Sequence, residues 1–185
     1  MNPGDALLPV PIYVDVDRTL LRTDWLHEAV LRFVVAHPWR AWLLFWWLLR
    51  GRAHLKSQLA SEGGLDPALL PLHEGLVDYL AQQARRGRAV HLASASPRIL
   101  VERLARRLTF AGDVLASEPG VNLKGEVKLA AVQRHSGGQP FAYAGDAVAD
   151  RPIFRAASAC IPVVGIPEQR DRRIRLNVTD QFGGT

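Results

Sequence analysis

Residues 10–21 constrain the fold of this chain more than any other stretch. They read Val-Pro-Ile-Tyr-Val-Asp-Val-Asp-Arg-Thr-Leu-Leu, a short apolar run that ends in two acids, Asp15 and Asp17. Such a run is typical of a buried parallel strand, whose carboxyl end is where α/β proteins place their sites. Alternate side chains of a strand share a face, so we expect both carboxylates to point the same way.

Two carboxylates that lie so close require a counter-charge. A hard cation such as Mg²⁺, which takes oxygen ligands and can add a substrate phosphate to its shell, supplies that charge most simply. The structural alternative is that Asp15 and Asp17 form a turn or cap a helix at the end of the strand.

Length and charge narrow the classes of protein that the chain can represent. Its 185 residues are enough for one domain with a core and one small insertion. The net charge of +5 comes mainly from arginines scattered over helical stretches, which favours anionic partners such as phosphates or acidic lipids. Because these arginines do not form one block, we expect no nucleic-acid partner.

The cysteine count and the first residues bear on the compartment. The single cysteine, Cys160, lies in an apolar run, so no intramolecular disulfide can form and a buried, inert thiol is expected. This fits a reducing compartment, and the first residues lack the basic and apolar segments of a secretory signal. We therefore expect a cytoplasmic protein.

The stretch between the first strand and residue 72 predicts helices. Asp24 is placed to cap a helix that ends before Pro38. Residues 41–49 are nine consecutive apolar residues, which rise only about 14 Å as a helix against roughly 30 Å of hydrocarbon, so they cannot span a bilayer. Four of the five tryptophans cluster in residues 39–49 between arginines, a composition typical of a helix in a membrane interface. The alternative is ordinary burial against the main domain or a second copy.

A second buried strand is expected at residues 89–93, and it leads directly into Ser94, Ala95, Ser96 and Pro97. Pro97 suits the first position of a helix, and Ser96 suits its N-cap. Free backbone N–H groups at such a helix start would receive a phosphate, with Ser94 beside it.

Two lysines and two further acids follow later in the chain. A lysine at the start of a helix opposes the helix dipole, so Lys124 or Lys128 is better explained by a nearby negative charge, and we rank Lys124 first. Asp146 follows a predicted strand at residues 141–144, and Asp150 lies one helical turn further on. Asp150 could instead cap the helix that begins near Pro152.

The order of these segments resembles the four motifs of the haloacid dehalogenase (HAD) superfamily, in its phosphoserine-phosphatase-like branch. The motifs are Asp-Val-Asp-Arg-Thr from Asp15, Ser94, Lys124-Gly125-Glu126, and Gly-Asp-x-x-x-Asp from Gly145. The resemblance implies a Rossmann-like three-layer α/β sandwich with a central parallel sheet. Its core would be residues 1–21 and 73–185, and residues 22–72 would form a helical C1-type cap.

The same resemblance implies a Mg²⁺-dependent phosphatase that acts through an aspartyl-phosphate. Asp15 would attack phosphorus, Asp17 would act as general acid and base, and the remaining motif residues would bind phosphate or metal. The implied residues are Asp15, Asp17 and Lys124 for catalysis; Ser94, Ala95, Thr19 and Lys128 for phosphate; and Asp15, Asp17, Asp146 and Asp150 for Mg²⁺.

Two finer features qualify the resemblance. Arg18 stands where the family very often has glycine, which implies strain if the position needs a positive φ and leaves open a catalytically weak or inactive module. Other segments, among them Trp39-Arg40 and Tyr143-Ala144-Gly145-Asp146, resemble the HAD domain fused to UbiA-type prenyltransferases. This implies a lipid or polyprenyl phosphate substrate and contact of residues 39–49 with the inner face of a bacterial membrane.

Overall fold

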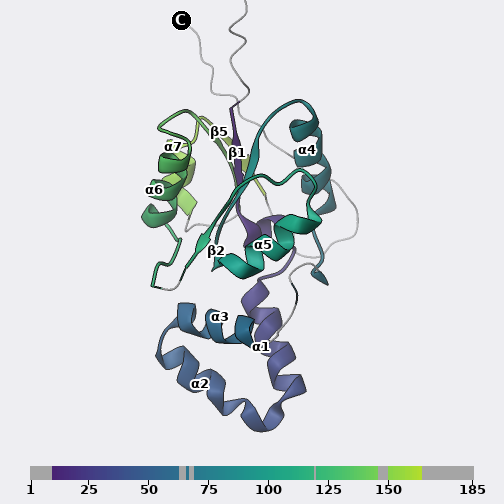
Figure 1. Ribbon diagram of the computed structural model, residues 1–185, viewed down its shortest axis with the longest axis vertical. Coiled ribbons are helices and arrows are strands. Elements are labelled where there is room, and N and C mark those ends of the chain that lie inside the picture. The colour runs from purple at the N-terminus through teal and green to yellow at the C-terminus, as the bar shows by residue number, and fades with distance from the viewer. Residues whose placement is uncertain (1–9, 63–65, 67–68, 119, 146–149, 164–185) are drawn as a thin grey trace, which may run out of the picture.

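The computed structural model describes residues 10–62, 66, 69–118, 120–145 and 150–163. Its centre is a five-stranded sheet in the order β3-β2-β1-β4-β5, and every neighbouring pair is parallel (Figure 1). The strands are β1 (Ile12–Val14), β2 (Val90–Pro97), β3 (Val114–Ser117), β4 (Ala142–Gly145) and β5 (Ala159–Pro162). The predicted α/β fold with a central parallel sheet is confirmed.

Helices cover both faces of this sheet. Figure 1 shows α4 and α5 on one side and α6 and α7 on the other, which gives three layers. Their bounds are α4 (Glu74–Arg85), α5 (Arg98–Arg107), α6 (Glu126–His135) and α7 (Arg151–Ala156). Successive strands along the chain are joined by helical crossovers, as parallel strands require.

The position of β1 decides where a site can form. The chain builds β1, β2 and β3 toward one edge and then returns to place β4 and β5 on the other side of β1. Ligands of open α/β sheets bind beyond the carboxyl ends of the strands at this reversal of direction. Asp15 is the first residue after β1, and its N–H donates to the Ala144 carbonyl of β4 at 2.9 Å.

The segment after β1 forms a helical unit beyond the carboxyl ends of the strands (Figure 1). It contains α1 (Trp25–Ala36), the short 3₁₀ turn η2 (Pro38–Arg40), α2 (Trp42–Leu49) and α3 (Arg52–Ser61). Asp24 caps α1 as expected, because its carboxylate accepts from the Leu26 N–H at 2.9 Å.

The chain leaves and re-enters the sheet domain at one place. Leu21 and Leu72 form an antiparallel bridge, flanked by hydrogen bonds of 2.9 Å from Arg22 N to Pro71 O and from His73 N to Leu20 O. The division into a cap of residues 22–72 and a core of residues 1–21 and 73–185 remains a prediction, but this double crossing lies where the division would fall.

Apolar packing continues from the sheet domain into the helical segment. One cluster joins Val14 of β1 and Leu100 of α5 to Trp25 and Phe33 of α1 and Leu59 of α3. A second cluster on the other face of the sheet contains Tyr13, Val132, Tyr143 and Ile153. Within the described ranges, none of the helices combines the length and apolar character that a membrane crossing requires.

Candidate active site

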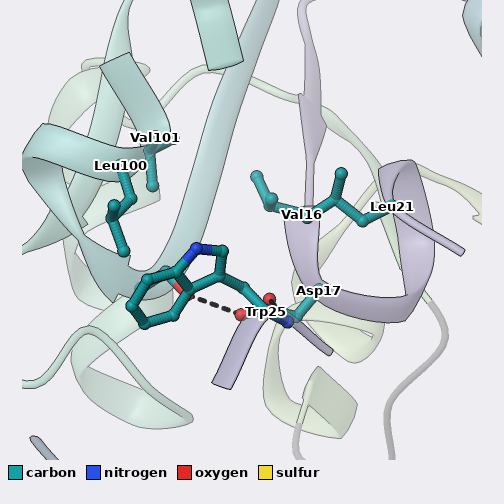
Figure 2. A pocket seen from close by; sticks show the side chains of 7 residues that line it. Val16, Asp17, Leu21, Trp25, Leu100 and Val101 are labelled. Carbon is teal, nitrogen blue, oxygen red and sulfur yellow. Dashed lines mark hydrogen bonds between the residues drawn. The ribbon is translucent and has the colours of Figure 1, made fainter. Parts of the chain in front are cut away.

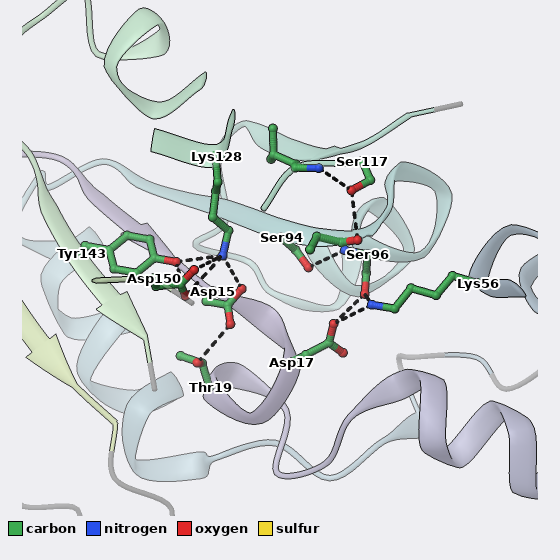
Figure 3. A network of polar contacts seen from close by, with 12 residues as sticks. Asp15, Asp17, Thr19, Lys56, Ser94, Ser96, Ser117, Lys128, Tyr143 and Asp150 are labelled. Atoms are coloured by element: carbon green, nitrogen blue, oxygen red, sulfur yellow. Dashed lines mark hydrogen bonds and ion pairs between the residues drawn. The ribbon is translucent and has the colours of Figure 1, made fainter. Parts of the chain in front are cut away.

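Asp15 lies at the centre of the polar groups beyond β1 (Figure 3). The residue is 7% exposed, and each of its carboxylate oxygens has a partner. Oδ1 accepts from Lys128 Nζ at 2.7 Å, and Oδ2 accepts from Thr19 Oγ1 at 3.3 Å. The loop that follows β1 therefore supplies both the acid and the hydroxyl that orients it.

Lys128 is the cation beside Asp15, whereas Lys124 is exposed. Lys128 is 2% exposed, and its ammonium group also donates to Tyr143 Oη at 2.8 Å and to Asp150 Oδ1 at 3.3 Å. The geometry thus reverses the predicted ranking of the two lysines. Lys124 precedes the first residue of α6 and lies outside the buried face of that helix.

The sequence contains a signal that could have identified Lys128. It lies four residues before Val132, and both side chains are buried on the same face of α6. A lysine on an apolar helix face that covers a sheet must be neutralised by acids from the strand ends. Lys124 lies before α6 and so does not share this buried helix face.

Asp150 and Tyr143 complete the buried group. Tyr143 Oη donates to Asp150 Oδ2 at 2.8 Å, and Asp150 is 3% exposed. Asp150 occupies the N-cap position of α7, as the alternative expected, but its carboxylate makes no capping hydrogen bond and instead contacts Lys128 and Tyr143. The sequence analysis does not place Tyr143 in the site, because an aromatic residue within a strand is normally part of the hydrophobic core. Asp146 lies outside the described residues.

Asp17 has a separate set of partners on the side of the helical segment. Its Oδ2 accepts from Ser96 Oγ at 2.6 Å and lies 3.5 Å from Lys56 Nζ of α3, while its Oδ1 accepts from the Trp25 N–H at 3.1 Å. Lys56 Nζ also donates to Ser96 Oγ at 3.2 Å. Lys56 was not predicted, because nothing in the sequence of α3 reports how α3 lies on the sheet domain.

The expected helix start at Ser96 and Pro97 is wrong. Strand β2 runs through Pro97, and α5 begins at Arg98 with no side-chain cap. The Ser96 hydroxyl instead donates to the Asp17 carboxylate, and such a charge-assisted hydrogen bond is stronger than one between neutral groups. Ser94 is buried, and its hydroxyl accepts from the Ser96 N–H at 3.0 Å. The carbonyl of Ala95 accepts from Ser117 Oγ at 2.9 Å.

Arg18 has a positive φ, the conformation expected at a position where related proteins very often have glycine. Its φ is 59° and its ψ is 4°, in the left-handed region, and among the described residues it alone combines a positive φ with a side chain. This conformation costs a non-glycine residue roughly 1–2 kcal/mol. It turns the chain between Asp17 and Thr19, so that the latter side chain faces Asp15.

Burial and like charges raise the pKa of Asp15. Loss of solvent is the main cause, the carboxylates of Asp150 and Asp17 add to it, and Lys128 opposes it, with the result that the pKa of Asp15 is raised to about 6. Burial lowers the pKa of Lys128, but Asp15 and Asp150 outweigh this effect and raise it. Three carboxylates thus share two ammonium groups, counting Lys56, and this set of oxygen donors fits a further cation.

Comparison with known proteins assigns the family. The model of the haloacid dehalogenase-like hydrolases matches residues 12–155. The chain belongs to the haloacid dehalogenase-like hydrolases. The uncharacterized protein y4nM of Sinorhizobium fredii (strain NBRC 101917 / NGR234) is 30% identical over 154 residues, which are 83% of this chain and 30% of that protein. The matched chain thus spans about three tenths of that relative.

Solved structures share the fold of this HAD-like hydrolase. A substrate-bound phosphoserine phosphatase has a TM-score of 0.57 and 19% identity, over 83% of this chain and 85% of that one. A phosphoserine phosphohydrolase-like protein from Francisella tularensis subsp. tularensis SCHU S4 has a TM-score of 0.57 and 15% identity, over 83% and 86%. A protein of unknown function from Bordetella pertussis Tohama I has a TM-score of 0.57 and 16% identity, over 82% and 88%.

A small apolar pocket adjoins Asp17 in this HAD-like hydrolase (Figure 2). Its empty volume is about 190 Å³, and its walls come from the loop after β1, the start of α1, the end of β2 and α5. The lining residues are Val16, Asp17, Leu21, Trp25, Ser96, Leu100 and Val101.

A second polar cluster lies at the opposite, amino ends of the strands. His91 Nδ1 and His135 Nε2 lie 3.4 and 3.3 Å from Asp113 Oδ2, close enough for the three groups to share a metal ion. Protein hydrogen bonds already use the imidazoles: the Asp113 N–H donates to His91 Nδ1 at 3.1 Å, and Tyr13 Oη lies 2.8 Å from His135 Nδ1. We interpret the cluster as a structural link between β1, β2 and α6.

Proposed function

We propose that this HAD-like hydrolase is a Mg²⁺-dependent phosphoric monoester hydrolase that works through an aspartyl-phosphate. The observation that carries the proposal is the placement of Asp15 at the switch point of the sheet, with Lys128 Nζ at 2.7 Å. A carboxylate held in this way can act as a nucleophile, and the ammonium group can neutralise charge on the phosphoryl oxygens. A phospho-aspartyl intermediate analogue of phosphoserine phosphatase has a similar fold, with a TM-score of 0.56.

The reaction would proceed in two displacements. A carboxylate oxygen of Asp15 forms a bond to phosphorus while the ester P–O bond breaks, and the leaving alcohol takes a proton from Asp17. Water then attacks phosphorus and gives its proton to Asp17, which releases phosphate and restores the Asp15 carboxylate. Asp17 is suited to this exchange because Ser96, at 2.6 Å, and the Trp25 N–H fix both of its oxygens.

The residues near Asp15 fit a divalent cation. Its carboxylate, the main-chain carbonyl of Asp17 and the Asp146 carboxylate would hold Mg²⁺, which supplies charge neutralisation for the phosphoryl group. Asp150 is engaged with Tyr143 and Lys128 at 2.8–3.4 Å, so its proposed part is to position the ammonium group of Lys128. On this basis we propose Lys128, and not Lys124, for the function of the predicted third motif.

For the substrate we propose a lipid or polyprenyl phosphate. The apolar pocket beside Asp17 and the exposed tryptophan helix α2 support an apolar leaving group. Lys56, 15% exposed at its side chain, reaches Asp17 from α3 and would meet an anionic substrate as it enters. The resemblance to HAD domains fused to UbiA-type prenyltransferases points to the same substrate class.

A catalytically weak or inactive module is the second candidate. The observation that favours it is the side chain of Arg18, a long cation in the left-handed conformation directly after the second acid of the first motif. Such a module would keep the HAD fold for binding to a membrane surface or a protein.

Hydrolysis of p-nitrophenyl phosphate with Mg²⁺ and with EDTA separates the two candidates. We expect Mg²⁺-dependent release of phosphate by the wild type, none by Asp15→Asn, and normal release by the control Asp78→Asn, an exposed acid on α4. A wild type no faster than Asp15→Asn would refute the enzyme reading. A panel that compares farnesyl phosphate with phosphoserine then tests the substrate class, and a preference for phosphoserine would overturn the lipid proposal.

A further inference from the structure

The outer face of α2 exposes large apolar side chains where a soluble protein normally places polar ones. Only Trp47 of this helix is buried, and Leu43 and Leu44 pack partly against the core. Large apolar side chains at 51–71% exposure occupy the rest of the helix and the turn before it. They are Trp39, Trp42, Phe45, Trp46, Leu48 and Leu49.

Helical geometry separates these side chains into two faces. At 100° per residue, the inward positions 43, 44 and 47 lie on one side, and positions 42, 45, 46 and 49 lie on the opposite side. Packing within the chain therefore explains only one face of α2. The opposite face is an apolar surface that the described residues leave uncovered, and such surfaces on soluble proteins mark interaction sites.

The charges around this face are of one sign. No aspartate or glutamate occurs between Glu28 and Glu62, whereas five cations do, namely Arg32, Arg40, Arg50, Arg52 and Lys56. Two of these form ion pairs within the protein. Arg40 makes a bidentate ion pair with Glu62, at 2.8 and 3.0 Å, and Lys56 pairs with Asp17. Arg32, Arg50 and Arg52 are exposed.

We propose that the outer face of α2 docks onto the surface of an anionic lipid bilayer. Tryptophans prefer the boundary between head groups and acyl chains, and exposed arginines attract acidic head groups, so this combination matches a bilayer surface in both chemistry and charge. The eight residues of α2 rise about 12 Å, which suits a helix lying in the interface.

The position of α2 in the fold is compatible with this docking. Figure 1 shows α2 at the end of the helical segment farthest from the sheet, with α1 and α3 between it and the strands. A bilayer can therefore contact α2 without contacting the sheet domain. The proposal names the surface and the lipid chemistry of membrane binding, and it holds whether or not the chain hydrolyses phosphate esters.

Vesicle co-sedimentation of the full chain tests the proposal. The vesicles are phosphatidylcholine alone and phosphatidylcholine with 30 mol% phosphatidylglycerol, an amount chosen to give a clearly anionic surface of about the charge density of natural membranes. We expect binding to the anionic vesicles at low salt, at least tenfold weaker binding for Trp42→Gln/Trp46→Gln, and a blue shift of tryptophan fluorescence for the wild type. Arg50→Gln/Arg52→Gln should lose the preference for anionic vesicles.

Matched controls keep the test specific. Ile99→Gln/Val127→Gln removes two exposed apolar residues from the core helices and should bind vesicles as the wild type does. Circular dichroism and p-nitrophenyl phosphate hydrolysis report whether each variant folds and works, so failure of docking is distinguishable from failure of the proposed enzyme. The proposal would be overturned if the wild type bound neither kind of vesicle, or if Trp42→Gln/Trp46→Gln bound anionic vesicles as well as the wild type does. A wild-type dimer that Trp42→Gln/Trp46→Gln converts to a monomer, without vesicle binding, would assign the face to a second copy.

Discussion

Replacing Lys128 by methionine removes the only ammonium group that contacts Asp15 among the described residues while keeping the length of the side chain. The variant leaves Asp15 and Asp150 buried beside each other without their shared cation. Breaking a buried ion pair from one side typically costs about 3–5 kcal/mol. For a chain of this size, each kcal/mol lowers the melting temperature by about 2–4 °C, so we expect a decrease of about 6–20 °C at pH 7.

The pH dependence of this loss follows from the pKa of Asp15. In the wild type that pKa is about 6, against an ordinary value of 3.8. When the pH falls from 7 to 5, protonation of Asp15 therefore stabilises the folded wild type only over the last unit or so, below pH 6. Lys128 lowers the pKa of Asp15, so without it we expect that pKa to rise further and protonation to stabilise the folded variant over a wider part of this range. The destabilisation should therefore be smaller at pH 5 than at pH 7, by up to about 1.4 kcal/mol for each pH unit gained.

Thermal unfolding with EDTA at pH 7 and pH 5 measures both quantities, and the matched control is Lys124→Met. Because Lys124 is exposed, its loss should change stability by less than about 0.5 kcal/mol. With Mg²⁺, Lys128→Met should lower kcat by about 10²–10³, the effect of removing one charge-stabilising donor, while Lys124→Met should retain activity. Loss of activity in Lys124→Met together with a stable, active Lys128→Met would refute this assignment of the site.

Two further changes test the charge balance around the acids. The raised pKa of Asp15 makes the folded state less stable as pH rises from 3.8 through 6, at a cost of about 3 kcal/mol above pH 6. Inactive Asp15→Asn should therefore be more stable than the wild type at pH 7.5 in EDTA, by up to that amount, and no more stable below pH 4. Urea unfolding at both pH values checks this, and a less stable variant at pH 7.5 would contradict it. Lys56→Met should lower kcat/KM about 10–100-fold, since a hydrogen bond to a charged group contributes about 1.5–3 kcal/mol. Its effect on stability should be small, because the 3.5 Å contact between Lys56 and Asp17 is partly exposed. Unchanged kinetics would show that Lys56 has no part in the site.

The sheet and the order of the motifs could be predicted because they follow from local patterns. A buried parallel strand requires a continuous apolar run, and residues 12–14 and 90–93 provide it. Helix α1 begins where Asp24 can cap it, and this too is local chemistry. Acids that follow strands then meet at the carboxyl edge of the sheet, whatever the lengths of the connections.

The errors concern groups whose partners lie far along the chain. Ser96 has the local features of a helix cap, but its hydroxyl donates to the carboxylate of Asp17, 79 residues away, and the segment stays extended through Pro97. The choice between Lys124 and Lys128 depends on the residue at which α6 begins, because this fixes which lysine faces β1 and β4. Helix boundaries are set by tertiary contacts as much as by sequence, so a motif match alone could not decide between the two lysines.

The two cations of the site come from different parts of the fold, and this has a consequence for catalysis. Lys128 reaches Asp15 from α6 of the sheet domain, whereas Lys56 reaches Asp17 from α3 of the helical segment. Among the described residues, the partners of the proposed nucleophile therefore come from the sheet domain, whereas Lys56, the cation paired with the proposed acid and base, comes from α3. Because the same segment carries the apolar face of α2, contact of that face with a surface would act on the part of the molecule that completes the environment of Asp17.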